Sequence, residues 1–457
     1  MSIPELEQST TQSDLSVTSI RPRKSPDPTS RRPARYRDVF AIAEFRAVFL
    51  ADLISLLGDQ IAAVAVAVLL YQRSGSPLLA ALGYATAYLP WLLGGPLLAA
   101  WAERFPRRTV LIGCDLGRAA FIGLAALPGL PLLVIGLLVL TAALLAPPFE
   151  STRSALLPQI LEGDRYPVAM SLRDAVHQSA QLVGFGVGGA LVLVLSAPGA
   201  LALDAVTFAV SALILHSGLR RSSATPWAVI DLSQDADPAD ASPGPGGRSL
   251  WREAVAGLAV IRADRMLSTP LLLGIVGAAY AIVPEAIAPA YADSVGGDAT
   301  AVGLIMAAVA GGSVLGGLAI GRLVAPARRI RLIQPLALAG TLPLLLILLR
   351  PGLTVSLVLF ALTGLASSYQ VAANAMFAQR LPVAVRARAF GIAITGLYGG
   401  QALAIVLAGA AAQFLGPAAV VASAGLLGAI GVLLLPHPGQ HAGPTRSRRQ
   451  RKRHRQG

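Results

Sequence analysis

Cysteine and charged residues are scarce in this chain of 457 residues. Its one cysteine, Cys114, excludes an internal disulfide. Charged residues make up 13% of the chain and hydrophobic residues 54%, whereas an average soluble domain has about 25% charged residues. The shortage of charge excludes an ordinary soluble fold of this size and predicts a protein that lies in a lipid bilayer.

Enzyme and targeting signatures are also absent. The sequence has no Walker motif and no Cys/His metal-ligand spacing, which argues against ATP hydrolysis and a metal centre on this chain. Residues 1–44 lack the apolar core of roughly 7–15 residues that a signal peptide needs. We therefore expect no enzyme activity and no cofactor, and we expect the first apolar segment to insert without cleavage.

Twelve apolar segments approach the roughly 20 residues that span a bilayer core. They lie at about residues 45–71, 77–101, 108–128, 130–149, 167–195, 198–216, 266–290, 299–323, 330–349, 353–376, 386–412 and 416–435. Their apolar runs are continuous rather than alternating, which favours helices over a β-barrel, and only these two structures satisfy the backbone in lipid. The sequence predicts an all-α polytopic membrane protein with twelve transmembrane helices.

Polar stretches divide the chain into five parts. We expect a disordered N-terminal tail (1–44), a six-helix bundle (45–217), a linker (218–265), a second six-helix bundle (266–435) and a basic tail (436–457). The linker holds an acidic stretch that is too polar to fold. It ends in an amphipathic helix, which we expect to lie at the membrane interface.

The basic residues predict the orientation of the chain. If the N-terminus is cytoplasmic, all Lys and Arg fall on the cytoplasmic side except Arg73, Arg350, Arg118 and Arg173. Both termini are then cytoplasmic. The excess of Arg over Lys, with much Ala and Gly, indicates a high-GC bacterial genome, so we expect a bacterial inner-membrane protein. For the basic tail we favour contact with an anionic inner leaflet over a nucleic-acid partner, and we expect a monomer.

The two halves of the chain contain similar sequences. Residues 94–108 (GGPLLAAWAERFPRR) close the second segment, and residues 316–329 (GGLAIGRLVAPARR) close the eighth. Each is a small-residue helix followed by a cationic turn that ends in Arg-Arg. Repeated halves of this kind are a transporter design.

The first of these motifs resembles the loop between the second and third helices of the major facilitator superfamily. Four further motifs resemble its branch of drug and siderophore exporters, and together the set spans about residues 45–435. They are Ser55–Asp59, Leu203–Phe208, Arg252–Leu258 and Arg386–Gly391. The resemblance implies two pseudo-symmetric six-helix bundles around a central cavity, alternating access and export driven by a proton gradient.

Three features depart from the family pattern. Glu103 stands where the family usually has Asp, Phe185 replaces the Pro of the antiporter pattern, and the RxxQG pattern of the fourth helix is missing. These departures weaken the inference of proton antiport more than the inference of fold.

The loop motif predicts a cytoplasmic gate that latches the two halves, as the resemblance implies; simple positive-inside topology is the alternative. The gate residues are Gly95, Glu103, Arg104, Arg107, Arg108, Asp115, Arg118, Arg328 and Arg329. Within this set, Asp115 and Arg118 are three apart and predict a structural ion pair.

Asp59 lies about 14 residues into the first segment, roughly 21 Å deep at 1.5 Å per residue. An ionisable group near the midplane is a functional hypothesis by default, so Asp59 is a candidate proton site; a structural hydrogen bond is the alternative. Asp52 and Ser55 share its helix face.

Further polar residues complete a predicted proton or substrate pathway, with structural polar networks as the alternative. They are Arg173, Asp174, His177 and Gln181 on the fifth segment, Glu285 on the seventh, and a stripe of Thr363, Ser367, Gln370 and Asn374 on the tenth. We expect the stripe to face Asp59 across the cavity and Glu150 to lie at the inner surface. Glycines that pack the fifth helix are Gly184, Gly186, Gly188 and Gly189.

Three functions fit the sequence. The first is a proton-coupled exporter of amphipathic small molecules, such as drugs, antibiotics or siderophores. The second is uptake or uniport of a small organic solute, and the third is a non-transporting membrane scaffold or sensor that uses the long tails.

Overall fold

The structure is a computed structural model that describes residues 36–93, 102, 104–161, 164–219, 259, 262, 264–381 and 386–436. These residues form helices and turns and contain no strand. Nine of their helical segments are long and apolar enough to cross a membrane. The prediction of an all-α polytopic membrane protein is confirmed.

The first half of the chain contains eight described helices. They are α1 (Tyr36–Phe40), α2 (Ala43–Ser74), α3 (Pro77–Ala85), α4 (Leu89–Leu93), α6 (Arg107–Ala125), α7 (Leu132–Ala143), α8 (Ala146–Ile160) and α9 (Arg165–Gly218). Helix α9 contains two of the predicted spans. A kink at Ser196, which has a φ of 66° and lies just before Pro198, separates them. Helix α1 lies within residues 1–44, so the end of the expected disordered tail is helical.

The second half contains ten α-helices and one short 3₁₀ helix among the described residues. They are α11 (Arg265–Ala281), α12 (Val283–Ala286), α13 (Ala288–Ser294), α14 (Ala299–Leu323), α15 (Pro326–Ala339), α16 (Leu342–Leu346), η4 (Ile347–Leu349), α17 (Leu353–Ser367), α18 (Tyr369–Arg380), α19 (Arg386–Leu415) and α20 (Pro417–Leu434). Several of these are pieces of one span: α11 and α12 together form the span Arg265–Ala286, and α17 and α18 form Leu353–Arg380.

The fourth predicted span ends too early. The sequence places its end at residue 149, but α8 continues to Ile160. Pro147 and Pro148 lie in the first turn of α8. Backbone N–H groups in the first turn of a helix have no carbonyl partner within the helix, so a proline there loses no hydrogen bond. The Pro-Pro pair therefore starts a new helix rather than ending the old one.

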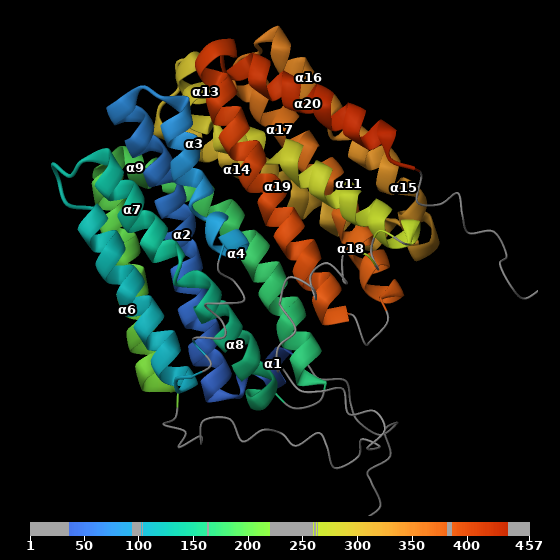
Figure 1. Cartoon of the computed structure of the whole chain (residues 1–457). Helices are drawn as coiled ribbons and strands as arrows, with labels where there is room; N and C mark the ends of the chain where they lie inside the picture. The colour runs from blue at the N-terminus through green and yellow to red at the C-terminus, as the bar shows by residue number, and fades with distance from the viewer. Residues whose placement is uncertain are drawn as a thin grey trace, which may run out of the picture.

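Figure 1 shows the two halves side by side, the first in blue to green and the second in yellow to red. The halves pack against each other at one end, where α9 crosses α14 and α3 crosses α19. Towards the other end, the labelled helices α8 and α18 stand apart. Large apolar side chains such as Leu133, Leu213 and Leu427 are exposed on the outside of the bundle, as expected for a surface that contacts lipid.

Glycines permit the close crossing of α9 and α14. A Cβ atom built on Gly303 would lie 2.5 Å from the backbone oxygen of Phe185 and 2.7 Å from the Cα atom of Gly189. On the other side of α9, Gly184 and Gly188 lie against α2. The glycine run of the fifth predicted segment thus lies between a helix of its own half and a helix of the second half.

Four parts of the sequence interpretation fall on residues that the structure does not describe. They are most of the N-terminal tail, most of the linker with its amphipathic helix, the gate residues Gly95 and Glu103, and the basic tail.

Candidate functional site

A cavity of about 470 Å³ lies in the interior of the bundle. Most of its wall comes from the first half of the chain, through α2, α3, α4, α6, α7, α8 and α9. Among the described residues the second half contributes only Leu397, Tyr398 and Gln401, all on α19. The first half therefore provides nearly all the chemistry that a bound solute would meet.

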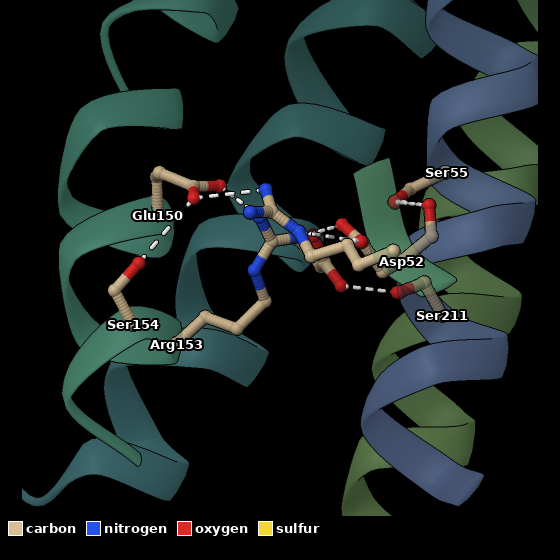
Figure 2. A network of polar contacts seen from close by, with 8 residues as sticks. Asp52, Ser55, Glu150, Arg153, Ser154 and Ser211 are labelled. Atoms are coloured by element: carbon tan, nitrogen blue, oxygen red, sulfur yellow. Dashed lines mark hydrogen bonds and ion pairs between the residues drawn. The ribbon is translucent and has the colours of Figure 1, made fainter. Parts of the chain in front are cut away.

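Residues that line the cavity form a chain of ion pairs that links three helices, and Figure 2 shows this network from close by. Arg153 on α8 forms ion pairs with Asp52 on α2 and with Glu150 on its own helix. Arg173 on α9 donates to Glu150 over 2.9 Å, and its Nε atom lies 3.6 Å from Asp52 Oδ2. Two arginines and two carboxylates thus form one charge-balanced group in the cavity wall.

Burial explains why these charges are paired. The side chain of Arg153 is 3% exposed, while those of Asp52 and Glu150 are 20% and 29% exposed. A buried arginine is tolerated only where carboxylates compensate for the lost hydration. The Arg153 side chain is therefore held within the protein, while the carboxylates of Asp52 and Glu150 are partly accessible from the cavity.

A second charged group lies deeper along α2. Arg118 Nη2 on α6 donates to Asp59 Oδ1 over 2.6 Å, and its guanidinium lies 4.0 Å from the centre of the Phe208 ring. Asp204 on α9 interacts electrostatically with the same arginine, and its residue is 1% exposed. Its Oδ1 atom accepts from Thr207, and Oδ2 has no hydrogen-bond partner among the described residues.

The predicted ion pair of Asp115 with Arg118 is not formed as a direct contact. Asp115 accepts a hydrogen bond of 2.5 Å from Ser211 on α9 instead, and Arg118 turns to Asp59. The two side chains point to different neighbours: Asp115 faces α9, against which α6 packs, and Arg118 reaches Asp59 on α2. Partners across helices therefore replace the partner three residues away.

Seven aromatic rings within the described ranges also line the cavity. They are Tyr84, Tyr88, Trp91, Phe149, Phe185, Phe208 and Tyr398. Trp91 on α4 stacks on Tyr398 of α19 with ring centroids 5.4 Å apart, which is a preferred geometry for aromatic pairs. This pair joins the two halves of the protein across the cavity.

In the described part of the chain, three side-chain hydrogen bonds join the halves at the packed end. Tyr84 donates to Glu285 over 2.5 Å, and Tyr71 donates to Asp293 over 3.0 Å. In the third, Gln413 Nε2 donates to Ser76 Oγ over 2.8 Å. Each bond pairs a side chain of the first half with one of the second, so this end is closed by specific contacts as well as by glycine packing.

The structure brings together half of the predicted pathway residues. Asp52, Ser55, Asp59, Arg173, His177 and Gln181 all line the cavity. Asp174 is exposed outside the cavity wall, and Glu285 lies behind Tyr84 rather than on the wall. The interpretation of Glu150 as an inner-surface residue is wrong, since it lines the cavity and pairs with two arginines.

The tenth-segment stripe does not face Asp59. None of Thr363, Ser367, Gln370 or Asn374 lines the cavity. Thr363 and Ser367 are buried in protein, where Ser367 donates to the backbone oxygen of Thr363, and Asn374 is exposed. Neighbouring helices can cover polar residues of an apolar span as well as a cavity can, as Thr363 and Ser367 show.

Three arginines of the predicted gate bind backbone carbonyls within their own half. Arg107 donates to Ala155 over 3.0 Å and Arg108 to His216 over 2.5 Å. Arg329 donates to the oxygens of Val324 and Gly321 at the end of α14. Cations at helix C-termini satisfy unpaired carbonyls and complement the helix dipole. Arg104 and Arg328 are exposed.

Sequence reasoning missed Arg153, Asp204 and the aromatic wall as site residues. Apolar length ends the fourth span at residue 149 and therefore places Arg153 in the loop that follows it. Two features of the sequence indicate that Arg153 is a site residue. It lies one helical turn after Glu150, and Pro147-Pro148 can begin a helix that contains both residues. No group of three His, Cys, Asp or Glu side chains suited to a metal ion occurs in the described part of the chain.

Comparisons with known proteins agree with this architecture. The family model described as Major Facilitator Superfamily matches residues 48–350 and 271–456. A sequence search of curated proteins gives no match.

Three solved structures show the likeness in fold. A mutant of the nucleoside transporter NupG superposes with a TM-score of 0.65 at 13% identity, covering 86% of this chain and 99% of that one. A bacterial homologue of the iron transporter ferroportin, in an inward-facing state, gives 0.63 at 13% identity, with 86% and 98% covered. A bacterial homologue of the human lysosomal transporter Spinster, inward-facing and occupied, gives 0.60 at 14% identity, with 89% and 95% covered.

Proposed function

Because the chain belongs to the major facilitator superfamily and is therefore a multi-pass membrane transporter, we propose that it exports amphipathic organic solutes in exchange for protons. The observation that carries the proposal is the cavity, whose wall combines aromatic rings with carboxylates that are paired with buried arginines.

The cavity wall favours a solute with both apolar and polar parts. Rings such as Trp91 and Phe208 offer flat apolar surface, while Asp59 and Glu150 present partly exposed carboxylate oxygens to a polar group. Inorganic ions would gain little from an aromatic wall. The charges are already paired, so a charged group of a solute has to compete with an internal partner.

The group around Arg118 supports proton coupling. Asp59, Asp115 and Asp204 all interact electrostatically with this one arginine. A single guanidinium neutralises one carboxylate, so the group can hold an additional proton without gaining net positive charge. Asp59 has the most accessible side chain of the three, at 36% exposure, and we assign it the role of proton acceptor from the cavity.

Export is the direction that we favour, with the arginine-rich loops in the cytoplasm as the positive-inside rule predicts. The hydrogen bonds between the halves then close the outer end, and the cavity is loaded from the cytoplasm. A proton entering from outside in the alternate state would displace the solute from the Asp59 side of the cavity. The exporter motifs at Ser55–Asp59 and Leu203–Phe208 support this direction.

Efflux from cells tests the proposal. A strain that overproduces the protein is screened against a panel of amphipathic antibiotics and siderophores, and efflux of any compound to which it gains resistance is then measured with and without a protonophore. We expect efflux that stops when the proton gradient collapses. Efflux that is independent of the gradient would reject proton coupling.

Uptake is the second candidate, because Phe185 occupies the antiporter proline position and lines the cavity. Net accumulation of the compound in overproducing cells would select this reading over export. The scaffold reading has no support from the fold, since the family consists of transporters.

A further inference from the structure

The two tyrosine–carboxylate bonds at the packed end differ in burial. Glu285 is 4% exposed and accepts its 2.5 Å hydrogen bond from Tyr84, which is also 4% exposed. Asp293 accepts a 3.0 Å bond from Tyr71 and is exposed. Both bonds cross between the halves, so Glu285 and Asp293 accept hydrogen bonds from tyrosines of the first half only when this end is closed. The halves thus have to separate at this point for the cavity to open here.

No cation faces Glu285 among the described residues. It lies on α12, which packs against α3, α11, α13, α14, α19 and α20. The titratable or charged groups on these elements and on the segment after α3 are Tyr84, Tyr88, Arg265, Tyr280, Tyr291, Asp293, Arg322, Arg386, Arg388 and Tyr398. The four arginines lie at the far ends of helices α11, α14 and α19, near the arginine-rich loops. Tyrosine hydroxyls are thus the polar partners of Glu285.

Closing this end therefore changes the surroundings of Glu285. A carboxylate that is buried without a cation loses its hydration and gains no charge to compensate for it. A protonated carboxyl group avoids that loss and still accepts the hydrogen bond from Tyr84 through its Oε2 atom. Asp293 keeps its contact with water in the closed state and experiences no such change.

We propose that Glu285 is a proton-operated latch, which takes up a proton when Tyr84 and α3 close over it and releases the proton when the halves separate at this end. The proton comes from the aqueous phase that Glu285 faces in the separated state and binds to a carboxylate oxygen. No other bond to hydrogen changes, because Tyr84 donates its hydrogen in the closed state in either case. The latch goes beyond the proposed function, since it requires neither a particular solute nor the proton site at Asp59.

The distance between the two halves at this end reports whether the latch is closed or open. Spin labels on Gln72→Cys and Ser294→Cys, two exposed positions of the first and second halves, report whether the end is closed. The background carries Cys114→Ala, and the protein is held in lipid nanodiscs without solute. We expect the closed-to-open ratio to fall as pH rises, by up to about tenfold per pH unit, which is the limit for one linked proton.

Two matched variants separate the latch from other titrating groups. Glu285→Gln preserves shape and the acceptor for Tyr84 but cannot ionise, so its closed-to-open ratio should stay constant over the same pH range. Asp293→Asn, at the exposed bond, should keep the pH dependence of the parent. If Glu285→Gln responds to pH like the parent, or if the parent does not respond at all, the latch is rejected. A failure of proton-coupled transport at Asp59 leaves this measurement unchanged, so the two proposals fail separately.

Discussion

Arg118 Nη2 lies 2.6 Å from Asp59 Oδ1, and this ion pair joins the third predicted span to the first at the cavity wall. Asp59 is the accessible partner, with a 36% exposed side chain, while that of Arg118 is 11% exposed. The carboxylate is therefore within reach of a solute or a proton, while the arginine is held by its neighbours. Binding at Asp59 competes with an internal contact, which connects the cavity to the ion pair between α2 and α6.

Replacing Arg153 with Met should destabilise the protein strongly. The substitution leaves Asp52 and Glu150 in the cavity wall with only Arg173 for compensation. Removal of one partner from a buried ion pair costs about 3–5 kcal/mol. We expect a clearly lower midpoint of thermal unfolding in detergent, measured by the loss of monodisperse protein.

Arg322→Met is the control for this variant. Arg322 is exposed at the end of α14, and its loss should leave the midpoint nearly unchanged. Equal midpoints for the Arg153 variant and the parent would show that the charge network does not support the fold.

Adding a methyl group at Gly303 should prevent closure of the packed end. The new Cβ atom would lie 2.5 Å from the backbone oxygen of Phe185, and backbone atoms cannot move aside as a flexible side chain can. In Gly303→Ala a cysteine at Gln72 should react several-fold faster with a membrane-impermeant thiol reagent, and transport should fall. Gly317→Ala on the same helix has nothing within 4 Å of its Cβ and should behave like the parent; a similar effect of both substitutions would contradict the packing argument.

Truncating Tyr398 should weaken solute binding. The ring stacks on Trp91 and supplies one of few contacts from the second half. Loss of the contact between the Tyr398 ring and an aromatic group of the solute would cost about 0.5–1.5 kcal/mol, so KM for the transported compound should rise up to about tenfold in Tyr398→Ala. Tyr398→Phe retains the ring and should stay near the parent value. An unchanged KM in the alanine variant would place the solute elsewhere.

Arg104 and Arg328 should be accessible from the same side of the membrane. Each lies after a corresponding helix of one half, in the loops that the positive-inside rule places in the cytoplasm. Single cysteines at these positions should be protected from an impermeant reagent in intact cells and labelled after permeabilisation. A cysteine at Arg73 should show the opposite pattern, and labelling of Arg104 and Arg328 from different sides would disprove the paired halves.

The sequence predicted the fold well because one quantity, apolar length, decides it. Each apolar run had to be helical and near bilayer length to be stable in lipid. The boundary at Pro147-Pro148 was wrong because proline both ends and begins helices, and apolar length does not distinguish the two. That error moved Arg153 from the interior to a loop.

The site was predicted less completely, because partners across helices depend on packing. Asp52, Asp59 and Arg173 were recognisable as polar groups inside apolar spans. Their partners come from distant segments, as Arg118 does for Asp59. The stripe from Thr363 to Asn374 shows the same limit, since periodicity places residues on one helix face but leaves open which neighbour that face meets.

Exchange of solute for protons in a purified system tests the central claim most directly. The protein is reconstituted into liposomes that contain a pH-sensitive dye, and the compound found by the resistance screen is added on one side. The parent should couple movement of the compound to movement of protons in the opposite direction. Asp59→Asn should reduce this coupled movement at least about tenfold, the loss expected when an essential acid–base group is removed, and Asp174→Asn, outside the cavity wall, should retain it. Movement of the compound without protons, or full coupling in Asp59→Asn, would contradict the account.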